Sequence, residues 1–277
     1  MNVAELVPLT DRDFRGFREI IYRESGIHIS EHKRELLTAR LSRRVRSLGI
    51  ARFADYLATV TRDPAERVEM LDRIVTNETR FFREPKQFEF LEETILPSWQ
   101  RNAAEGKRPR RARVWSAGCS TGQEPYSIAM SLLSQLEGWD VEILASDISG
   151  RALRQSMAGL WPVDKVAEIP DRYLPFVLKG VRSQSGKMIA GPRLRDVIRF
   201  QRINLHEELP EIGMFDLVFC RNVLIYFDVE SRTSAVSRLL SRLVPSGFLF
   251  LGHSESLLNS GRRLRPAAPS VYTRGQA

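Results

Sequence analysis

The sequence predicts an α/β protein in which a small all-helical domain precedes a doubly wound parallel sheet. As far as about Arg80, apolar residues recur at helical spacing. From Arg113 onward, short apolar strands alternate with helices, as in proteins with a parallel sheet. At about residues 171–199 this alternation breaks, which predicts a small inserted antiparallel β subdomain. We therefore expect a helical domain over residues 1–80, a linker and connecting helix over 81–112, and the sheet domain over 113–277.

Four helices are expected in the first segment. The first begins at Asp11-Arg12-Asp13, which resembles a capped start, and continues with the apolar residues Phe14, Phe17, Ile20 and Ile21 at helical spacing. The second runs from about Glu31 to Leu48, and its apolar face consists of Leu36, Leu37, Leu41, Val45 and Leu48. Two shorter helices follow near residues 53–61 and 64–76.

The second helix carries a concentration of positive charge. Between Lys33 and Leu48, Glu35 is the only acidic residue. The solvated face of an ordinary amphipathic helix would explain such a run of charges, but the local excess favours a surface that docks on an acidic partner. The candidate docking residues are Lys33, Arg34, Arg40, Arg43, Arg44 and Arg46.

The rest of the chain predicts the linker and the strands of the sheet. Residues 77–84 join the two domains, a helix follows from Lys86 to about Gln100, and a basic stretch leads to Arg113. The first strand begins there, and the later strands are Val141–Asp147, Val197–Phe200, Phe215–Cys220 and Phe248–Gly252. Asp228 is expected to cap a helix that runs to Leu243, and Pro245-Ser246-Gly247 to form the turn into the last strand. In the insertion, Tyr173–Leu178 and Lys187–Ala190 predict a hairpin.

The composition limits the classes of protein that need to be considered. The formal net charge of +8 and the pI of about 9.9 favour an acidic partner, such as nucleic acid, anionic lipid or an acidic protein face. No apolar run reaches the roughly 18 residues of a membrane-spanning helix, and the N-terminus has no basic start followed by an apolar core. The two cysteines, Cys119 and Cys220, cannot form a disulfide framework, so we expect a cytoplasmic protein.

The most informative stretch, residues 113–127, predicts a strand, a glycine turn and the start of a helix. Gly118 and Gly122 leave room for a ligand close to the backbone. The helix that begins near Glu124 presents unpaired N–H groups in its first turn. This arrangement predicts a nucleotide-type pocket. The spacing differs from the dinucleotide fingerprint G-x-G-x-x-G, and a tight turn that binds nothing is the alternative.

Polar residues also stand at the ends of three further strands. Asp147 ends the second strand, where an acid can bind both ribose hydroxyls, although it could instead cap the next helix. Asn204, before Leu205, offers a donor and an acceptor that suit an adenine edge, although a lone asparagine is more often a turn residue. Arg221-Asn222 follows a central strand. Ligands of open α/β sheets bind at the carboxyl ends of the strands, so we expect these residues to share a pocket.

Five motifs occur in order along nearly the whole chain. They are Asn77-Glu78-Thr79-x-Phe81-Phe82-Arg83-Glu84, Trp115-Ser116-Ala117-Gly118-x-Ser120-Thr121-Gly122-x-Glu124-Pro125-Tyr126-Ser127, Ala145-Ser146-Asp147-Ile148, Phe219-Cys220-Arg221-Asn222-Val223-x-Ile225-Tyr226-Phe227-Asp228 and Gly252-His253-Ser254-Glu255. These motifs resemble those of the CheR family, the chemotaxis receptor glutamate O-methyltransferases. The resemblance implies a Rossmann-like methyltransferase fold, S-adenosylmethionine (SAM) as methyl donor and S-adenosylhomocysteine (SAH) as product.

The resemblance also implies roles for individual residues. Asn77, Thr79 and Arg83 would line the cofactor from the linker, beside Gly118 of the glycine turn. Glu124 would face the methionine end of SAM, and Asp147 would hold the ribose. Asn204-Leu205 and Arg221-Asn222 would frame the adenine and the sulfonium region. Tyr226 would lie close to the transferred methyl, and Arg101 is a candidate for a family arginine that approaches the substrate.

The chemistry of this reaction agrees with the residues present. Methyl transfer from a sulfonium to a glutamate is an in-line displacement at carbon, and the carboxylate, with an unperturbed pKa of about 4.3, is already ionised at neutral pH. No general base is therefore expected, and Tyr226 would act by positioning. The enzyme has to align the reactants and remove water from the nucleophile. The four histidines lack zinc-ligand spacing, and no metal is expected.

The resemblance further implies partners. The basic helix would dock on glutamate-rich helices of chemoreceptors, and the insertion corresponds to a subdomain that in some members binds a short peptide at the receptor C-terminus. Gly180 and Gly186 are present in its loop, but Arg182 stands where a further glycine is expected, so this use stays open. We expect a monomer that neither inserts into membranes nor binds nucleic acid, with both cysteines as free thiols near the pocket.

Two alternatives remain to be weighed. A SAM-dependent nucleic-acid methyltransferase would suit the net charge, but the Asp-Pro-Pro-Tyr-like motif usual in adenine-N6 enzymes, which holds an extruded base, is replaced here by Cys220-Arg221-Asn222-Val223. No Pro-Cys pair of the cytosine-C5 type is present either. The other alternative is a SAM-binding sensor without activity. The intact Asn77, Arg83, Asp147, Asn222 and Tyr226 argue against it.

Overall fold

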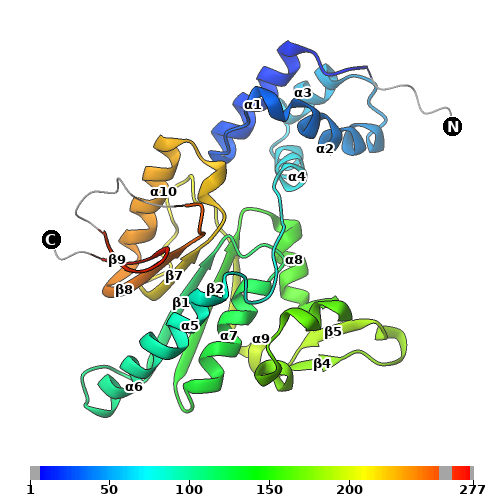
Figure 1. The fold of residues 1–277 in the computed structure, drawn as a ribbon. Coiled ribbons are helices and arrows are strands. Elements are labelled where there is room, and N and C mark those ends of the chain that lie inside the picture. The colour runs from blue at the N-terminus through cyan, green and yellow to red at the C-terminus, as the bar shows by residue number, and fades with distance from the viewer. Residues whose placement is uncertain (1–6, 256–263, 275–277) are drawn as a thin grey trace.

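The computed structural model describes residues 7–255 and 264–274, which form a helical domain, a sheet domain and a small β subdomain (Figure 1). The helical domain lies at one end of the molecule, and the irregular segment 75–84 leads from it to the sheet. The outermost residues of the expected 1–80 and 113–277 domains lie outside the described ranges. Within those ranges, no helix combines the length and the apolar character needed to cross a membrane.

From residue 7 onward, where the structure describes it, the helical domain has four helices around one core. They are α1 (Asp11–Ser25), α2 (Arg34–Ser47), α3 (Phe53–Arg62) and α4 (Pro64–Ile74), and a 3₁₀ turn at Glu31–Lys33 precedes α2. Thr10, rather than an aspartate, caps α1, because its hydroxyl accepts the Asp13 N–H at 3.2 Å. The buried side chains of this domain form a separate hydrophobic cluster.

The expected apolar face of α2 is only partly correct. Leu37, Leu41 and Val45 are buried and repeat every four residues, which places them on one face of the helix. Leu36 is 45% exposed and Leu48 is 40% exposed. Leu36 lies about 100° from Leu37 around the helix and so points away from the core, whereas Leu48 lies beyond the end of α2.

Within residues 7–255 and 264–274, the main sheet has seven strands in the order β6-β2-β1-β7-β8-β10-β9. The first five strands in this order run parallel, as predicted, whereas β10 and β9 are antiparallel and were not expected from the sequence. The strand order reverses between β1 and β7, which makes the carboxyl ends of these two strands the switch point of the fold. The bounds are β1 (Arg111–Ala117), β2 (Asp140–Asp147), β6 (Ile198–Arg202), β7 (Phe215–Cys220), β8 (Leu243–Leu251), β9 (Leu264–Ala268) and β10 (Val271–Arg274).

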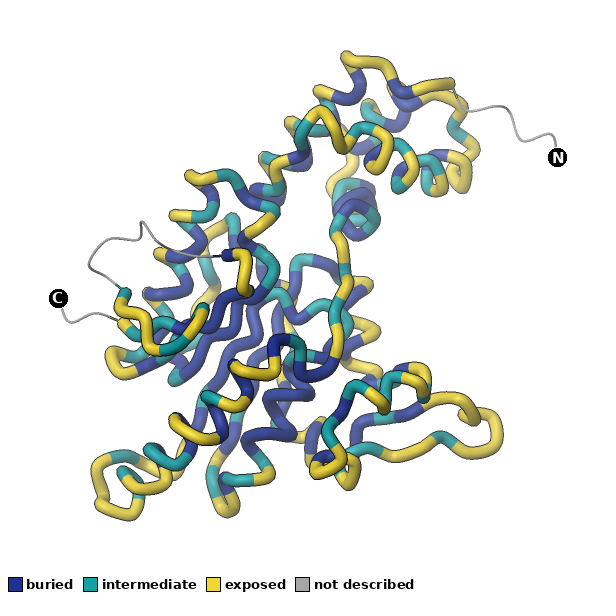
Figure 2. The backbone as a smooth tube through the Cα atoms, viewed as in Figure 1, coloured by how far each residue is buried: buried dark blue, intermediate teal, exposed yellow. Residues whose placement is uncertain are grey.

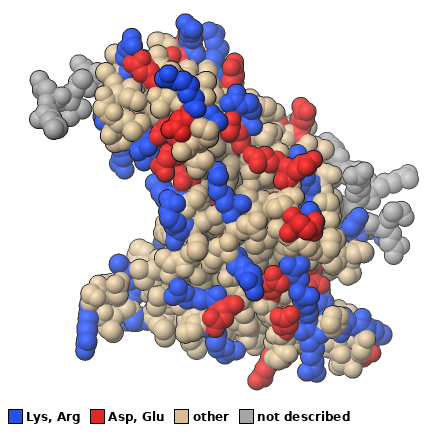
Figure 3. All heavy atoms as spheres, turned by 180° about the vertical axis from the view of Figure 1, so that it is seen from behind, with Lys and Arg blue, Asp and Glu red and all other residues tan. Residues whose placement is uncertain are grey.

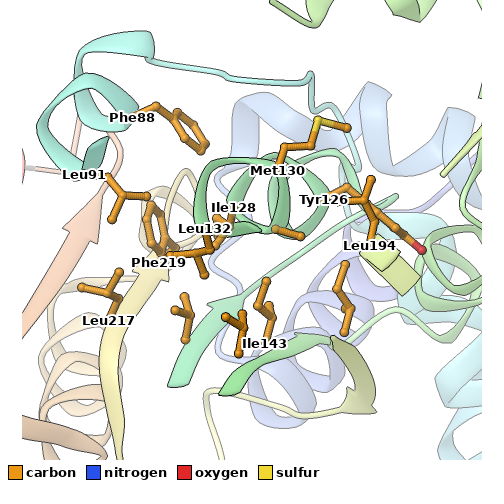
Figure 4. Close-up of a cluster of buried hydrophobic side chains, with 14 of the residues drawn as sticks. Phe88, Leu91, Tyr126, Ile128, Met130, Leu132, Ile143, Leu194, Leu217 and Phe219 are labelled. Carbon is orange, nitrogen blue, oxygen red and sulfur yellow. The ribbon is translucent and has the colours of Figure 1, made fainter. Parts of the chain in front are cut away.

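Helices cover both faces of the sheet, so the doubly wound prediction is confirmed. Alternate residues of the strands enter two clusters: Val114, Ile143 and Phe219 in one, Trp115, Leu144 and Val218 in the other. Figure 4 shows the first cluster, in which Phe88, Ile128 and Phe219 meet between helix and sheet. In Figure 2 these strands form the buried centre of the molecule. The helices are α5 (Pro85–Phe90), a π-helical turn (Leu91–Ile95), α6 (Leu96–Ala104), α7 (Gln123–Gln135), α8 (Gly150–Ala158) and α10 (Val229–Ser241).

The expected turn at Pro245-Ser246-Gly247 is wrong, because β8 runs through it. Phe215 pairs with Leu243 and Leu217 with Phe248, so the extra residues of β8 form a bulge. A Cβ on Gly247 would lie 2.8 Å from the Asp216 carbonyl oxygen, which explains why glycine occupies the bulge. Asp228 caps α10 as predicted, since its carboxylate accepts the Ser231 N–H at 2.8 Å.

The small β subdomain contains three antiparallel strands, where the sequence predicted a hairpin. Their order is β3-β5-β4, with β3 at Leu160–Pro162, β4 at Val177–Lys179 and β5 at Lys187–Ala190. The subdomain therefore begins before the expected residue 171. The first part of the expected hairpin segment Tyr173–Leu178 lies in a 3₁₀ helix, Asp171–Phe176, and only Val177 and Leu178 belong to a strand. The short helix α9 (Pro192–Asp196) leads back to β6.

The helical domain contacts the sheet domain at the end of β7. Ile27 forms an isolated antiparallel bridge with Phe227, and the His28 N–H donates to the Tyr226 carbonyl at 2.8 Å. The Tyr22 hydroxyl donates to the Asp228 carboxylate, also at 2.8 Å. The start of the chain is thereby connected to the turn that follows β7.

Candidate active site

A cavity of about 320 Å³ lies between the helical domain and the carboxyl ends of β1, β2, β6 and β7. Its size is within the range of pockets that hold small-molecule ligands. Its walls include Gly118 and Asp147 from the strand ends, Thr76 to Arg80 from the connecting segment, and Leu36 from α2. Figure 3 shows that the molecule is hollowed between the helical domain and the β subdomain, with lysines and arginines around the hollow. Residues that the sequence placed far apart therefore surround one space.

The glycine turn forms the floor of the cavity together with Asp147. Gly118 has φ +90°, and a Cβ there would lie 2.3 Å from a methyl group of Val223, so only glycine fits. The Asp147 carboxylate accepts the N–H groups of Ser120 at 2.8 Å and Ser149 at 2.9 Å. Ser149 itself caps α8, so the alternative of Asp147 as the helix cap is wrong. Burial raises the pKa of Asp147 above its ordinary value.

Glu124 lies at the start of α7 in a buried group of charges. Its carboxylate accepts the Ser116 hydroxyl at 2.7 Å and lies 3.4 Å from the Arg221 guanidinium. Burial raises the pKa of Glu124, and the charge of Arg221 opposes this shift. The Arg221 side chain is 2% exposed, donates to the Arg83 carbonyl and lies 3.4 Å from Glu84. Arg221 is thus held between two carboxylates, Glu84 and Glu124.

The connecting segment supplies one wall of the cavity. Asn77, Thr79 and Arg83 are half-buried and line it. The Ser120 hydroxyl donates to the Asn77 carbonyl at 3.0 Å, which ties the segment to the glycine turn. The Arg83 guanidinium makes a long hydrogen bond of 3.4 Å to the Glu78 carbonyl. Arg101, the candidate for an arginine near the substrate, is exposed on α6 and does not line the cavity.

Asn204 and Leu205 also line the cavity, after β6. The Asn204 amide nitrogen donates to the Glu24 carbonyl and to Glu207, both at 2.7 Å, and its oxygen accepts the His206 N–H at 3.1 Å. The side chain is therefore already engaged with the protein. Contact with an adenine edge would fall to the backbone groups of this stretch.

The turn after β7 closes the cavity on the side of the helical domain. Asn222, Val223, Ile225 and Tyr226 line it. Asn222 has φ +60°, a left-handed conformation that is uncommon outside glycine. Tyr226 is half-buried, and its carbonyl accepts the His28 N–H from the helical domain.

Two family models match the chain. Residues 77–272 match the SAM-binding domain of CheR methyltransferases, and residues 12–75 match the all-alpha domain of the same family. The chain belongs to the CheR methyltransferase family. It is 37% identical to chemotaxis protein methyltransferase 2 of Pseudomonas aeruginosa over 268 residues, which is 95% of this chain and 93% of that protein. It is 32% identical to the chemotaxis protein methyltransferase of Escherichia coli over 280 residues, covering 98% of this chain and 94% of that protein.

SAM is the cofactor of this CheR family member, and the charges of the cavity fit it. Glu84 and Glu124 share one guanidinium, so this corner of the site has an excess of negative charge. Of the two carboxylates, only Glu124 lines the cavity. An ammonium group beside Glu124 would complement this excess of negative charge, because buried carboxylates require a cationic partner.

The six basic residues proposed for docking fall into two groups. Arg34 pairs with Asp11, Arg40 donates to the Ile74 carbonyl and to Thr76, and Arg44 pairs with buried Glu66 at 2.5 Å. These three hold the helical domain together. The side chains of Lys33, Arg43 and Arg46 are exposed and make no ion pair or hydrogen bond with another described residue. A sequence gives no means of separating the two groups, because the partners of Arg34, Arg40 and Arg44 are distant along the chain.

Sequence reasoning missed two buried acidic residues beside this CheR site, Glu84 and Glu255. Both stand inside the quoted motifs, and their position as the last residue of a motif is the signal that could have found them. Both are buried, Glu84 beside Arg221 and Glu255 behind the turn that carries Asn222. No group of three His, Cys, Asp or Glu side chains that could hold a metal occurs in the described part of the chain.

The two cysteines are free and fully buried. They adjoin residues of the cavity, because Gly118 and Ser120 flank Cys119 and Arg221 follows Cys220, but neither thiol lines it. Burial raises the pKa of both thiols well above the ordinary value, so both are held as thiols rather than thiolates.

Proposed function

We propose that this SAM-dependent protein-glutamate O-methyltransferase of chemotaxis methylates glutamate side chains on the cytoplasmic helices of chemoreceptors. The products are a glutamate methyl ester and SAH. One observation carries the proposal: a single cavity is lined both by the strand ends of the SAM-binding domain and by Leu36 and Arg40 of the basic helix α2, with Lys33 from the 3₁₀ turn before it. A substrate bound to α2 would thus lie at the mouth of the cofactor site.

Within the cavity we assign the residues of each cofactor group by their chemistry. The buried Asp147 carboxylate accepts the ribose hydroxyls, and Glu124 accepts the ammonium group of the methionine end. Arg221 balances the charge of Glu84 and Glu124. The remaining contacts are assigned to Asn77, Thr79, Arg83, Gly118, Asn204, Leu205 and Asn222, which all line the cavity.

The reaction needs alignment rather than proton transfer. SAM, when bound, supplies a methyl group on a positively charged sulfur. An acceptor glutamate has an ordinary pKa of about 4.3 and is ionised at neutral pH, so no side chain has to act as a base. Tyr226 positions the reactants at the cavity wall, and the cavity removes water from the carboxylate, which strengthens the nucleophile.

Docking is assigned to the exposed cations of α2 and of the 3₁₀ turn before it. Lys33, Arg43 and Arg46 attract an acidic helical surface without losing an internal partner. Arg34, Arg40 and Arg44 support the same surface indirectly, since they fix α2 to its neighbours. We place the protein in the cytoplasm, where the methylated receptor helices lie, and we expect it to act as a monomer.

The β subdomain offers a second contact with the receptor. Strand β4 stands at the edge of the small sheet, so its outer backbone groups are open to an added strand. Leu178 and Val181 are 52% and 72% exposed there. An extended C-terminal receptor peptide is the proposed occupant, with main-chain pairing to β4.

Incubation with tritiated-methyl SAM and receptor-bearing membranes tests the proposed function. Labelled glutamate methyl esters release methanol in base, so base-labile counts are the expected result. Label that is stable to alkali, or label found in RNA, would contradict it and would support a nucleic-acid methyltransferase, which the comparisons do not favour. Cofactor binding without any transfer would indicate a sensor that lacks activity.

A further inference from the structure

One buried carboxylate outside the cavity holds the turn that carries Asn222 and Tyr226. Glu255 follows β8, is 2% exposed and does not line the cavity. Its Oε2 accepts the N–H groups of Asn222 and Gly252, both at 2.7 Å, and its Oε1 accepts the Ile225 N–H at 3.1 Å. A single side chain thereby joins the end of β8 to two points of the turn after β7.

The fit around this carboxylate is tight. A Cβ on Gly252 would lie 2.6 Å from the Asn222 amide nitrogen, 2.8 Å from the Glu255 carboxylate and 2.9 Å from the Asn222 backbone nitrogen. The turn itself includes the left-handed Asn222, a conformation that persists only where the surroundings hold it. The hydrogen bonds from Asn222 and Ile225 fix the turn at two points that are three residues apart. Tyr226 follows directly after the second point.

The opposite side of the turn is fixed as well. A Cβ on Gly118 would overlap Val223 at 2.3 Å, so the turn packs directly on the glycine turn of the cofactor site. The turn therefore lies between two fixed surfaces, the glycine turn in front and Glu255 behind. A shift of the Glu255 carboxylate would change where Asn222 and Tyr226 stand relative to the cavity.

We propose that Glu255 is a positioning residue for methyl transfer, which acts through the turn Asn222–Tyr226 without touching cofactor or substrate. This proposal rests on the proposed function, because Tyr226 is taken to align the reactants. Glu255→Gln tests it with almost no change of shape. In one orientation the NH₂ group of the glutamine faces the N–H groups of Asn222 and Gly252, and in the other it faces the N–H of Ile225. In both cases two hydrogen-bond donors face each other, so the turn has to move.

The expected result is a fall of kcat by about tenfold or more, since a displacement of about 1 Å at a reacting group can cost about 100-fold. The loss should shrink to less than about threefold when Glu255→Gln is introduced into a Tyr226→Phe background, because two residues that act as a unit are not additive. Glu137→Gln, an exposed glutamate after α7, is the matched control and should leave kcat unchanged.

Three outcomes separate the possibilities. An equal factor of loss in both backgrounds would overturn the proposal, because a general structural defect lowers the active fraction regardless of Tyr226. An unchanged kcat in Glu255→Gln would also overturn it. A wild-type protein that releases no base-labile methanol would instead overturn the proposed function, and the role of Glu255 with it. If Glu255→Gln does not fold, Gly252→Ala provides a second test, because its added methyl group would clash with the Glu255 carboxylate and with Asn222. It should lower kcat, and the loss should be smaller in the Tyr226→Phe background.

Discussion

Glu124 combines two properties at the residue scale that together predict how cofactor affinity depends on pH. Its carboxyl is buried, and burial raises its pKa above the ordinary value of a glutamate. The carboxyl has to be charged to pair with an ammonium group. At a pH below the raised pKa, binding of SAH should therefore release a proton from Glu124. We expect SAH affinity, measured by titration calorimetry, to rise as the pH increases through the raised pKa of Glu124.

The variant Glu124→Gln provides the control for this pH dependence. It should weaken SAH binding by about 10- to 100-fold, the range for a charge-assisted hydrogen bond, and should reduce the slope of affinity against pH. Burial also raises the pKa of Asp147, so part of the slope should remain. A slope identical in wild type and variant would show that Glu124 does not face the ammonium.

The same raised pKa has a consequence for stability in the absence of cofactor. Between the unfolded and the folded pKa of Glu124, the folded protein binds more protons than the unfolded chain. The stabilisation from this protonation is complete below the unfolded value and is lost as the pH rises through the folded value. The cofactor-free protein should therefore lose stability over this pH range, whereas the SAH complex should not.

The residues that the sequence placed at strand ends do meet at one cavity, but their partners could not be predicted. Topology alone brings Gly118, Asp147, Asn204 and Asn222 together, because parallel strands end at the same edge of a sheet. Whether an amide is free depends on groups distant in the chain. Asn204 is occupied by Glu24, about 180 positions away, and no local pattern contains that contact.

At the scale of elements, α2 carries two kinds of arginine side by side. Arg44 pairs with Glu66, whose other partner is the Tyr56 hydroxyl at 2.8 Å. Arg43 is exposed. Arg44→Ala should lower the free energy of unfolding by about 2–3 kcal/mol, less than the 3–5 kcal/mol of a fully buried pair, because its side chain keeps 23% exposure.

Arg43→Ala is the matched variant and should behave in the opposite way. Its free energy of unfolding should stay within about 0.5 kcal/mol of wild type, while KM for receptor membranes rises. Urea denaturation and the methanol-release assay measure the two effects. Equal losses of stability in Arg43→Ala and Arg44→Ala would contradict the division of α2 into a docking face and a supporting face.

The bulge of β8 shows why sequence patterns fail to predict some elements. Pro245 and Gly247 are turn residues, and a strand that contains both is predicted to end there. The pairing of β8 with β7 and β10 overrides this preference. The strands β3, β9 and β10 were missed for a related reason: they have three to five residues each and mostly lack strict alternation.

Gly247 also gives a prediction about stability. A Cβ there would meet the Asp216 carbonyl at 2.8 Å and Leu243 at 2.7 Å, so Gly247→Ala should destabilise the protein by about 1–3 kcal/mol. Gly150 begins α8, and a Cβ there would have its nearest neighbour at 3.5 Å. Gly150→Ala should therefore be neutral or stabilising by up to about 1 kcal/mol. Thermal unfolding of both variants tests the contrast.

At the scale of the whole molecule, the position of the helical domain decides what the cavity can do. Local patterns predicted the helices of that domain and the strands of the sheet separately. The contacts that join them include Tyr22 to Asp228 and His28 to Tyr226, and each of these links residues about 200 positions apart. Polar pairs of this kind produce no periodic sequence pattern, so they could not be predicted. These contacts hold the helical domain beside the strand ends, so that Lys33 and Arg40 line the same cavity as the carboxyl ends of the strands.

This arrangement predicts that receptor docking and cofactor binding differ in their response to salt. Raising the ionic strength from about 0.1 M to 1 M shortens the Debye length from about 10 Å to about 3 Å. The cations Lys33, Arg43 and Arg46 are exposed, so KM for receptor membranes should rise about tenfold. The charges around Glu124 and Arg221 are buried, so the Kd for SAH should change by less than about twofold.

The double variant Arg43→Gln with Arg46→Gln separates docking from general salt effects. It should raise KM at low salt and flatten the dependence on ionic strength, because fewer charges remain to be screened. Its kcat at saturating receptor should equal that of wild type, since neither residue lines the cavity. A wild-type KM that does not change with salt would mean that apolar contacts hold the receptor instead. The exposed Leu36 at the cavity wall would then be the residue to substitute next.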